Sequence, residues 1–155
     1  MEISLLADHP SAIETVASWY FNEWCRDSGS YTEDEVVKKV SASINRDTAP
    51  ILIIGKVNGV LAGSAELKIR EMDIYPEFEF WLGGVYVTKQ ARGQGVASKL
   101  VKEIISLAHK IGVKNLYLQT EDLTGGLYLQ HGFEPIEQVN YKGINVLVMS
   151  ANIGA

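Results

Sequence analysis

One turn of the sequence has the composition of an anion-binding site. It reads Gln90-Ala91-Arg92-Gly93-Gln94-Gly95-Val96-Ala97 and lies between an apolar run that ends at Val87 and a long run with helical spacing. The first amides of a helix have no partner within it, and the helix dipole adds about half a positive charge there. Glycines allow positive φ and close approach of the backbone to a ligand. Together these features favour a bound pyrophosphate.

The surrounding residues narrow the choice of pyrophosphate. A P-loop requires Gly-Lys-Ser/Thr, whereas Val-Ala-Ser-Lys follows Gly95. A dinucleotide fingerprint fits Gly93 and Gly95 but has Ser98 at its last position. The acids Glu121-Asp122 follow the next strand, where a ribose-binding acid could lie, so a dinucleotide-binding oxidoreductase stays open as a minor alternative. Against it, Asn58-Gly59 predicts an antiparallel hairpin.

The elements that must position this turn follow from periodicity. Residues 2–7 predict a strand, and Asp8 and Pro10 are expected to open a helix as its N-cap and early proline. Thr32-Glu33-Asp34-Glu35 has the pattern of a capping box before a second amphipathic helix that ends near Asn45. Two strands then flank Asn58-Gly59. The remaining predicted elements are a strand over 77–87, a helix over 97–111, a strand over 115–119, a short helix over 123–131, and a hairpin over 133–139 and 144–149.

The order β-α-α-β-β-β-α-β-α-β-β predicts an α+β fold with a mixed, mostly antiparallel sheet. The hairpin supplies the antiparallel part, and a right-handed βαβ crossover surrounds the glycine-rich turn. A chain of 155 residues fits one domain over 1–155. Gly83-Gly84 inside the strand before the turn predicts a β-bulge, because a glycine within a strand often marks one.

Composition excludes several classes of function. The net charge of −5 and the lack of a basic tract argue against a nucleic-acid partner and mildly favour a cationic one. No apolar run approaches the roughly 20 residues of a membrane span, so no membrane partner is expected. Cys25 is the only cysteine, which suits a reducing cytoplasm. The three histidines show no ligand spacing, so no metal site is predicted.

Two segments resemble the GNAT superfamily of N-acetyltransferases. The run 90–95 matches its Gln/Arg-x-x-Gly-x-Gly/Ala signature, and the match extends to Val85-Tyr86-Val87 before it and to 97–100 after it. The run 127–135, Leu-Tyr-Leu-Gln-His-Gly-Phe-Glu-Pro, is similar to the family's LYxxxGFxP segment. The order of elements agrees over nearly the whole chain. The resemblance implies an acetyl-CoA-dependent enzyme that needs no metal.

The resemblance assigns the cofactor contacts residue by residue. The main-chain amides that would hold the CoA pyrophosphate belong to Arg92, Gly93, Gln94, Gly95, Val96 and Ala97. The amides of Val85 and Val87 would pair with the pantetheine arm, and Val85 could also stabilise the oxyanion of the thioester. The family often has an asparagine seven residues before its tyrosine. Glu121 stands there in this sequence, which leaves the contact from that loop open.

The resemblance also assigns the proton transfers. Tyr128 occupies the position of the family's usual general acid, and a phenol that titrates near 10 can protonate a departing thiolate. Glu79 occupies the region of the base. A carboxylate with a pKa near 4.3 is poorly matched to an ammonium near 10.4, so Glu79 would act after burial or through water. The alternative is that Glu79 is a solvated acid at the end of the strand with no part in catalysis.

The implied reaction is direct acetyl transfer to a primary amine in a ternary complex. The acidic composition favours a small cationic acceptor, but the sequence does not identify it. A non-catalytic acyl-CoA-binding or sensing module, which would not need Tyr128, is the second interpretation. The oligomeric state is open, with a homodimer as one option.

Overall fold

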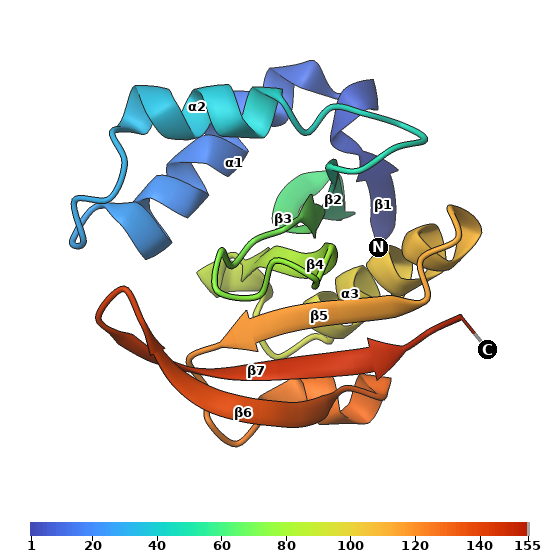
Figure 1. Cartoon of the computed structure of the whole chain (residues 1–155). Helices are drawn as coiled ribbons and strands as arrows, with labels where there is room; N and C mark the ends of the chain where they lie inside the picture. The colour runs from blue at the N-terminus through green and yellow to red at the C-terminus, as the bar shows by residue number, and fades with distance from the viewer. Residues whose placement is uncertain (155) are drawn as a thin grey trace.

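The sheet has seven strands in the order β1-β2-β3-β4-β5-β7-β6 (Figure 1). The computed structural model describes residues 1–154. All neighbouring strands are antiparallel except β4 and β5, which are parallel. This arrangement confirms the predicted mixed α+β fold. The strands are β1 (Glu2–Leu5), β2 (Ile51–Val57), β3 (Val60–Ile69), β4 (Phe80–Val87), β5 (Asn115–Thr120), β6 (Glu134–Tyr141) and β7 (Ile144–Asn152).

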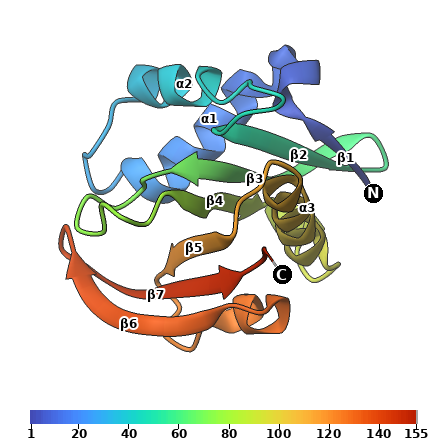
Figure 2. The ribbon, with the colours of Figure 1, turned by 45° about the vertical axis from the view of Figure 1, so that its right-hand side comes forward.

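Helices cover both faces of this sheet (Figure 2). Two of them, α1 and α2, pack on one face of β2, and α3 packs on the other face of β2, β3 and β4. The helices are α1 (Ile13–Tyr20), which a π-helical turn (Phe21–Cys25) continues, α2 (Glu33–Ser41) and α3 (Val96–Lys110). Four 3₁₀ helices occupy Leu6–Asp8, Pro10–Ala12, Lys89–Ala91 and Gly126–His131.

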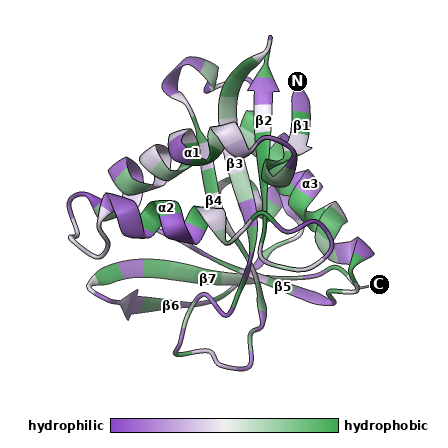
Figure 3. Ribbon diagram, turned by 90° about the horizontal axis from the view of Figure 1, so that it is seen from above, coloured by the Kyte–Doolittle hydropathy of each residue, from purple (hydrophilic) through white to green (hydrophobic). Residues whose placement is uncertain are grey.

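Alternation along β2 divides the apolar core between these two helical layers. Ile51 and Ile53 contribute to the core under α3, and Leu52 and Ile54 contribute to the core under α1 and α2. All four are at most 1% exposed, so β2 is apolar on both faces, as expected of a strand covered on both sides. The colouring in Figure 3 shows hydrophilic and hydrophobic residues mixed on α1 and α2, as in helices with one buried face.

Two local predictions are confirmed in detail. Thr32 caps α2: its hydroxyl accepts from the Glu35 amide at 3.2 Å, and the Glu35 carboxylate accepts from the Thr32 amide at 2.9 Å. Asn58 and Gly59 join β2 to β3 with φ values of 51° and 78°. Both features depend on residues within four positions of each other.

Three predicted elements are corrected. Asp8 caps no helix; it lies in a 3₁₀ turn and its carboxylate pairs with Arg46 at 2.5 Å. The helix expected over 123–131 is a 3₁₀ helix of residues 126–131, because glycines with positive φ precede, begin and follow it. The strand expected from residue 77 begins at Phe80, because the preceding residues form turns that hydrogen-bond within the segment from β3 to β4.

The predicted bulge is present in β4. Ser64 of β3 pairs with Tyr86 and Glu66 pairs with Gly83, so Ala65 alone faces two residues of β4, Gly84 and Val85. Gly84 has φ of 58°, which a residue with a side chain adopts only with strain. A Cβ atom on Gly84 would also lie 2.8 Å from Cζ of Tyr20. The bulge therefore requires glycine for its backbone and for its neighbour.

We expect Gly84→Ala to destabilise the fold more than an ordinary glycine substitution. The left-handed backbone costs about 1–2 kcal/mol and overpacking costs about 1–3 kcal/mol, so the free energy of unfolding in urea should fall by about 2–5 kcal/mol. Gly29→Ala is the matched control, since Gly29 has φ of 65° and nothing within 4 Å of its Cβ position. Equal losses in the two variants would contradict the role of Tyr20.

Candidate active site

A fork in the sheet opens between β4 and β5. Their register pair is Trp81 with Tyr117, and no later residue of β4 pairs with β5 within residues 1–154. The Thr88 amide donates to Ala62 of β3 at 2.8 Å. Because successive amides of a strand point to opposite edges, the Val87 amide points into the fork. An extended ligand could use this free edge as a strand would.

The glycine-rich turn closes one end of this fork. Gly95 is the N-cap of α3 with φ of 78°, and no side chain of the described residues caps the helix. No backbone hydrogen bond found in the described part of the chain is donated by the amides of Gly93, Gln94 or Gly95. A Cβ on Gly93 or Gly95 would meet nothing within 4 Å. These glycines therefore leave open space and free donors in front of a 15-residue helix.

The structure gathers most of the residues predicted to bind the cofactor around this turn. They line a shallow hollow, and those on the predicted list are Val87, Arg92, Gly93, Gly95, Val96 and Ala97. Gln94 lies outside the lining, and its side-chain amide donates to the Gln90 carbonyl at 3.3 Å. The Arg92 Nε donates to the Val87 carbonyl at 3.2 Å, which ties the turn to the end of β4.

Tyr128 lies on the short helix that faces this site. Its ring packs edge-on against Phe133, with centroids 6.2 Å apart, and contacts the core cluster to which Val85 and Val87 also contribute. Burial raises the pKa of the Tyr128 phenol to about 12, and the negative charge of Glu71 adds to the effect. Tyr128 therefore keeps its proton at neutral pH, as a general acid must.

One hydrogen bond ties the helix that carries Tyr128 to the start of α3. Ser98 Oγ and His131 Nε2 lie 2.8 Å apart. Burial lowers the pKa of His131, and Lys102 lowers it further, so the neutral imidazole is favoured.

Glu79 directly precedes β4 and is exposed. Its side chain is 49% exposed, and Oε2 is 3.5 Å from Nη2 of Arg70. The two residues also pair through their backbones, because the Arg70 amide donates to the Glu79 carbonyl at 2.6 Å. Proton transfer from an acceptor in the fork to Glu79 would therefore pass through an intervening water.

A buried polar cluster beside the fork was missed by the sequence interpretation. The Tyr20 hydroxyl donates to the Gly84 carbonyl at 2.8 Å, and the Ser64 hydroxyl donates to the same carbonyl at 3.1 Å. Two and four residues after Ser64, on the same face of β3, lie Glu66 and Lys68. The alternation Ser64-x-Glu66-x-Lys68 was a usable signal, since every second residue of a strand shares a face.

Burial and charge shift the titration of this cluster. Burial raises the pKa of Glu66, and Lys68 opposes that rise. Burial disfavours the Lys68 ammonium, but the carboxylates of Glu71 and Glu66 outweigh it and raise the Lys68 pKa. Burial also raises the pKa of Tyr20, and the Glu66 charge adds to this. Lys68 is therefore charged and Tyr20 neutral at physiological pH.

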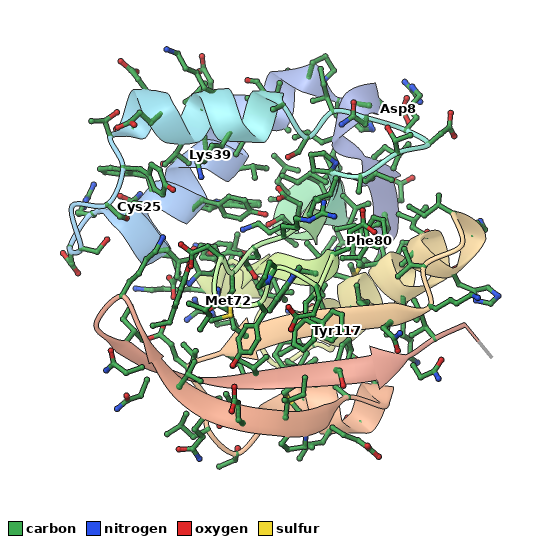
Figure 4. The ribbon with its side chains drawn as sticks, in the orientation of Figure 1. Asp8, Cys25, Lys39, Met72, Phe80 and Tyr117 are labelled. Atoms are coloured by element: carbon green, nitrogen blue, oxygen red, sulfur yellow. The ribbon has the colours of Figure 1, made fainter. Side chains whose placement is uncertain are left out.

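Two side-chain hydrogen bonds hold the segment between β3 and β4 against the hairpin of β6 and β7. Tyr75 donates a short hydrogen bond to Glu137 of β6, and Tyr141 donates to Asp73 at 2.9 Å. Beneath this segment, Met72 and Tyr117 contribute to one aromatic-rich cluster, and Figure 4 shows both in the middle of the molecule. The segment that leads into β4 is therefore held against the hairpin of β6 and β7.

Comparison with known protein families identifies the family of this chain. The model of the acetyltransferase (GNAT) family matches residues 11–133, which is most of the chain. The chain belongs to the GNAT family. No curated protein sequence matches it significantly.

Solved GNAT structures share the fold over nearly the full chain. A ribosomal-protein-alanine N-acetyltransferase from Brucella melitensis is 18% identical, with a TM-score of 0.76 and coverage of 98% of this chain and 99% of that one. An aminoglycoside 6'-N-acetyltransferase complexed with coenzyme A is 16% identical, with a TM-score of 0.75 and coverage of 99% and 97%. YncA of Salmonella typhimurium, a putative acetyltransferase solved with acetyl-CoA, is 18% identical, with a TM-score of 0.73 and coverage of 99% and 94%.

The described part of this GNAT chain has neither a metal-binding cluster nor a membrane-spanning helix. Within residues 1–154, no group of three or more His, Cys, Asp or Glu side chains is placed to hold a metal ion. Over the same residues, no helix has both the length and the apolarity to cross a membrane.

We expect the Tyr128 phenol of this GNAT domain to titrate later than an exposed tyrosine. Below about pH 11, the tyrosinate absorbance of Tyr128→Phe should match that of the parent, because the Tyr128 pKa is raised to about 12. Tyr31→Phe is the control. A hydrogen bond from Lys39 lowers the Tyr31 pKa, so this variant should lack part of the tyrosinate absorbance that the parent shows below pH 10. If Tyr128→Phe instead lacked the tyrosinate absorbance of one phenol between pH 9 and 10.5, the raised pKa assigned to Tyr128 would be contradicted.

Proposed function

We propose that this protein transfers an acetyl group from acetyl-CoA to the primary amine of a small cationic acceptor. The observation that carries the proposal is the open turn before α3, which points free donors at the end of the β4–β5 fork. Membership of the GNAT family supports acyl transfer from acyl-CoA. The CoA and acetyl-CoA complexes of two structural neighbours support the choice of cofactor.

The cofactor would run from the turn into the fork. The pyrophosphate would lie on the amides of residues 92–97, where the helix dipole favours an anion. The pantetheine arm would extend along β4 and accept a hydrogen bond from the Val87 amide. Val85 follows the bulge at Gly84, and its amide would meet the thioester oxygen, which becomes negative during attack.

The chemistry would be a direct displacement with every proton accounted for. The neutral amine attacks the thioester carbon, the new C–N bond forms and the C–S bond breaks. Tyr128 gives its proton to the CoA thiolate, and the resulting phenolate takes one proton from the positively charged nitrogen of the product. The proton lost earlier by the acceptor ammonium would reach Glu79 through water and then the solvent, which suits the exposed position of Glu79.

The acceptor and the setting are parts of the same proposal. Net charge of −5 favours cations, and two structural neighbours are an aminoglycoside 6'-N-acetyltransferase and a ribosomal-protein-alanine N-acetyltransferase. A cytoplasmic location fits the single cysteine, Cys25. A homodimer is one option for the assembly.

Binding of CoA should raise the melting temperature. At 100 times the dissociation constant, a ligand adds about 2.7 kcal/mol, or about 5–11 °C for a domain of this size. Gly95→Ala should weaken CoA at least tenfold, because its Cβ would occupy the approach of the pyrophosphate. Gly59→Ala is the matched control, since it has the same φ of 78° and open space, but in the hairpin. No stabilisation of the parent protein by CoA would refute the proposed function.

Turnover should depend on Tyr128 whereas cofactor binding should not. With a panel of an aminoglycoside, an alanine-terminated peptide and simple alkylamines, Tyr128→Phe should lower kcat about 100-fold or more, as measured by thiol release. The melting shift with CoA should be unchanged, and Tyr31→Phe should retain full activity. CoA binding with no turnover on any amine would favour the binding module, and equal rates in Tyr128→Phe would refute its role as the acid.

A further inference from the structure

One charged cluster beside the fork has no part in the chemistry proposed above. Lys68 Nζ contacts Glu71 Oε1 at 2.9 Å. Glu66 lies on the same face of β3 and is 6% exposed. Lys68 interacts with both carboxylates, since each of them raises its pKa. Lys39 of α2 also acts on Glu66 and opposes the rise of its pKa, so each carboxylate of the cluster has an ammonium group near it.

One atom of this cluster lacks a partner. Glu71 Oε2 is buried and has no hydrogen-bond donor among residues 1–154. The Lys68 ammonium occupies only the other oxygen of the same carboxylate. A buried carboxylate oxygen without a donor is unfavourable, and such atoms are rare in folded proteins. The missing donor is therefore expected from outside the chain.

The position of Glu71 points to the reaction centre. A Cβ on Gly83 would lie 3.2 Å from Glu71 Oε1, so the carboxylate lies over β4 just before the bulge. Its charge raises the pKa of both Tyr20 and Tyr128. These phenols belong to α1 and to the helix before β6. Glu71 therefore lies beside the bulge after which, in the proposed function, the Val85 amide meets the thioester.

We propose that Glu71, backed by Glu66 and Lys68, forms a socket for one ammonium group of the acceptor. This inference rests on the proposed function and narrows its substrate class to alkylammonium ions. A single ammonium group would supply the missing donor to Oε2. The terminal torsion of glutamate is broad, so the carboxylate can turn one oxygen to the ligand while Lys68 keeps the other.

We assign the rest of such an acceptor to the exposed ring of Trp24, which packs against Tyr20, the residue whose hydroxyl reaches the bulge. Its ring lies 5.2 Å from that of Tyr20 and is 40% exposed. An aromatic ring accommodates both an alkyl chain and a nearby cation. The socket therefore favours a cation attached to an apolar chain over a free inorganic cation.

The test measures binding of hexylammonium to the CoA-saturated protein by calorimetry. The parent should bind hexylammonium at least tenfold more tightly than hexanol, its uncharged analogue. The affinity of Glu71→Gln for hexylammonium should be at least tenfold weaker than that of the parent. With any amine that the parent acetylates, Glu71→Gln should raise KM at least tenfold while kcat changes less than threefold. Asp73→Asn removes the same charge from the same segment, where Asp73 accepts a hydrogen bond from Tyr141, and should change each value less than threefold.

The stabilisation by CoA separates the possible failures. If CoA raises the melting temperature of Glu71→Gln as it does that of the parent, the variant is folded and its binding result stands. If Glu71→Gln does not fold, Glu71→Asp keeps the charge, draws the carboxylate back and should weaken hexylammonium about tenfold. Equal affinity in parent and variant, equal binding of hexanol, or no binding of hexylammonium by the parent would each overturn the socket. Absence of CoA binding would instead refute the proposed function.

Discussion

The geometry of the site depends on the bulge at Gly84. Two residues of β4 face one residue of β3 there, which turns β4 away from β5 beyond Trp81. The Gly84 carbonyl accepts from Tyr20, and the single hydroxyl hydrogen of Ser64 lies within reach of both that carbonyl and the Tyr20 oxygen, so the three groups hold one another in place. Tyr20 belongs to α1, and the bulge is therefore held by a helix from the other end of the chain.

The bulge and the start of α3 act together. The bulge leaves the edge of β4 without a strand partner on the β5 side, and the turn after β4 leaves amides without partners before α3. Unpaired backbone donors are unfavourable in a closed core. Here both sets of donors open onto the same region, where a ligand with an amide-containing arm and a diphosphate can satisfy them. This complementarity is the physical reason to place acetyl-CoA in the fork.

The charged cluster gives the site a negatively charged part in addition to the positively charged part at the turn. Cationic side chains such as Arg92 and the dipole of α3 lie at the end where the pyrophosphate would bind. The carboxylate of Glu71 lies beside Gly83, just before the bulge, and Glu66 of β3 pairs with the same Gly83. Such a separation would orient an anionic cofactor and a cationic acceptor in opposite directions. Lys68 reduces the repulsion between the two carboxylates without cancelling both charges.

The sequence by itself determined the features that depend on neighbouring residues. The Thr32 capping box, the Asn58-Gly59 hairpin and the glycine-rich turn were predictable because their backbone geometry is set within about four residues. The order of the main strands and helices followed from periodicity. The mixed sheet followed from that order, and the bulge from a pair of glycines within a strand.

Only the tertiary structure decided which side chains meet across the fold. Asp8 does not cap a helix, because Arg46, far along the chain, takes its carboxylate. Glu79 is exposed, whereas Glu66 is buried, although both are single acids near apolar residues. Burial and charge pairing depend on what packs against a residue from distant segments, and these set the pKa directions of Tyr128 and Lys68. Local spacing contains no such information, and the folded chain alone shows that Glu71 has a buried oxygen without a donor.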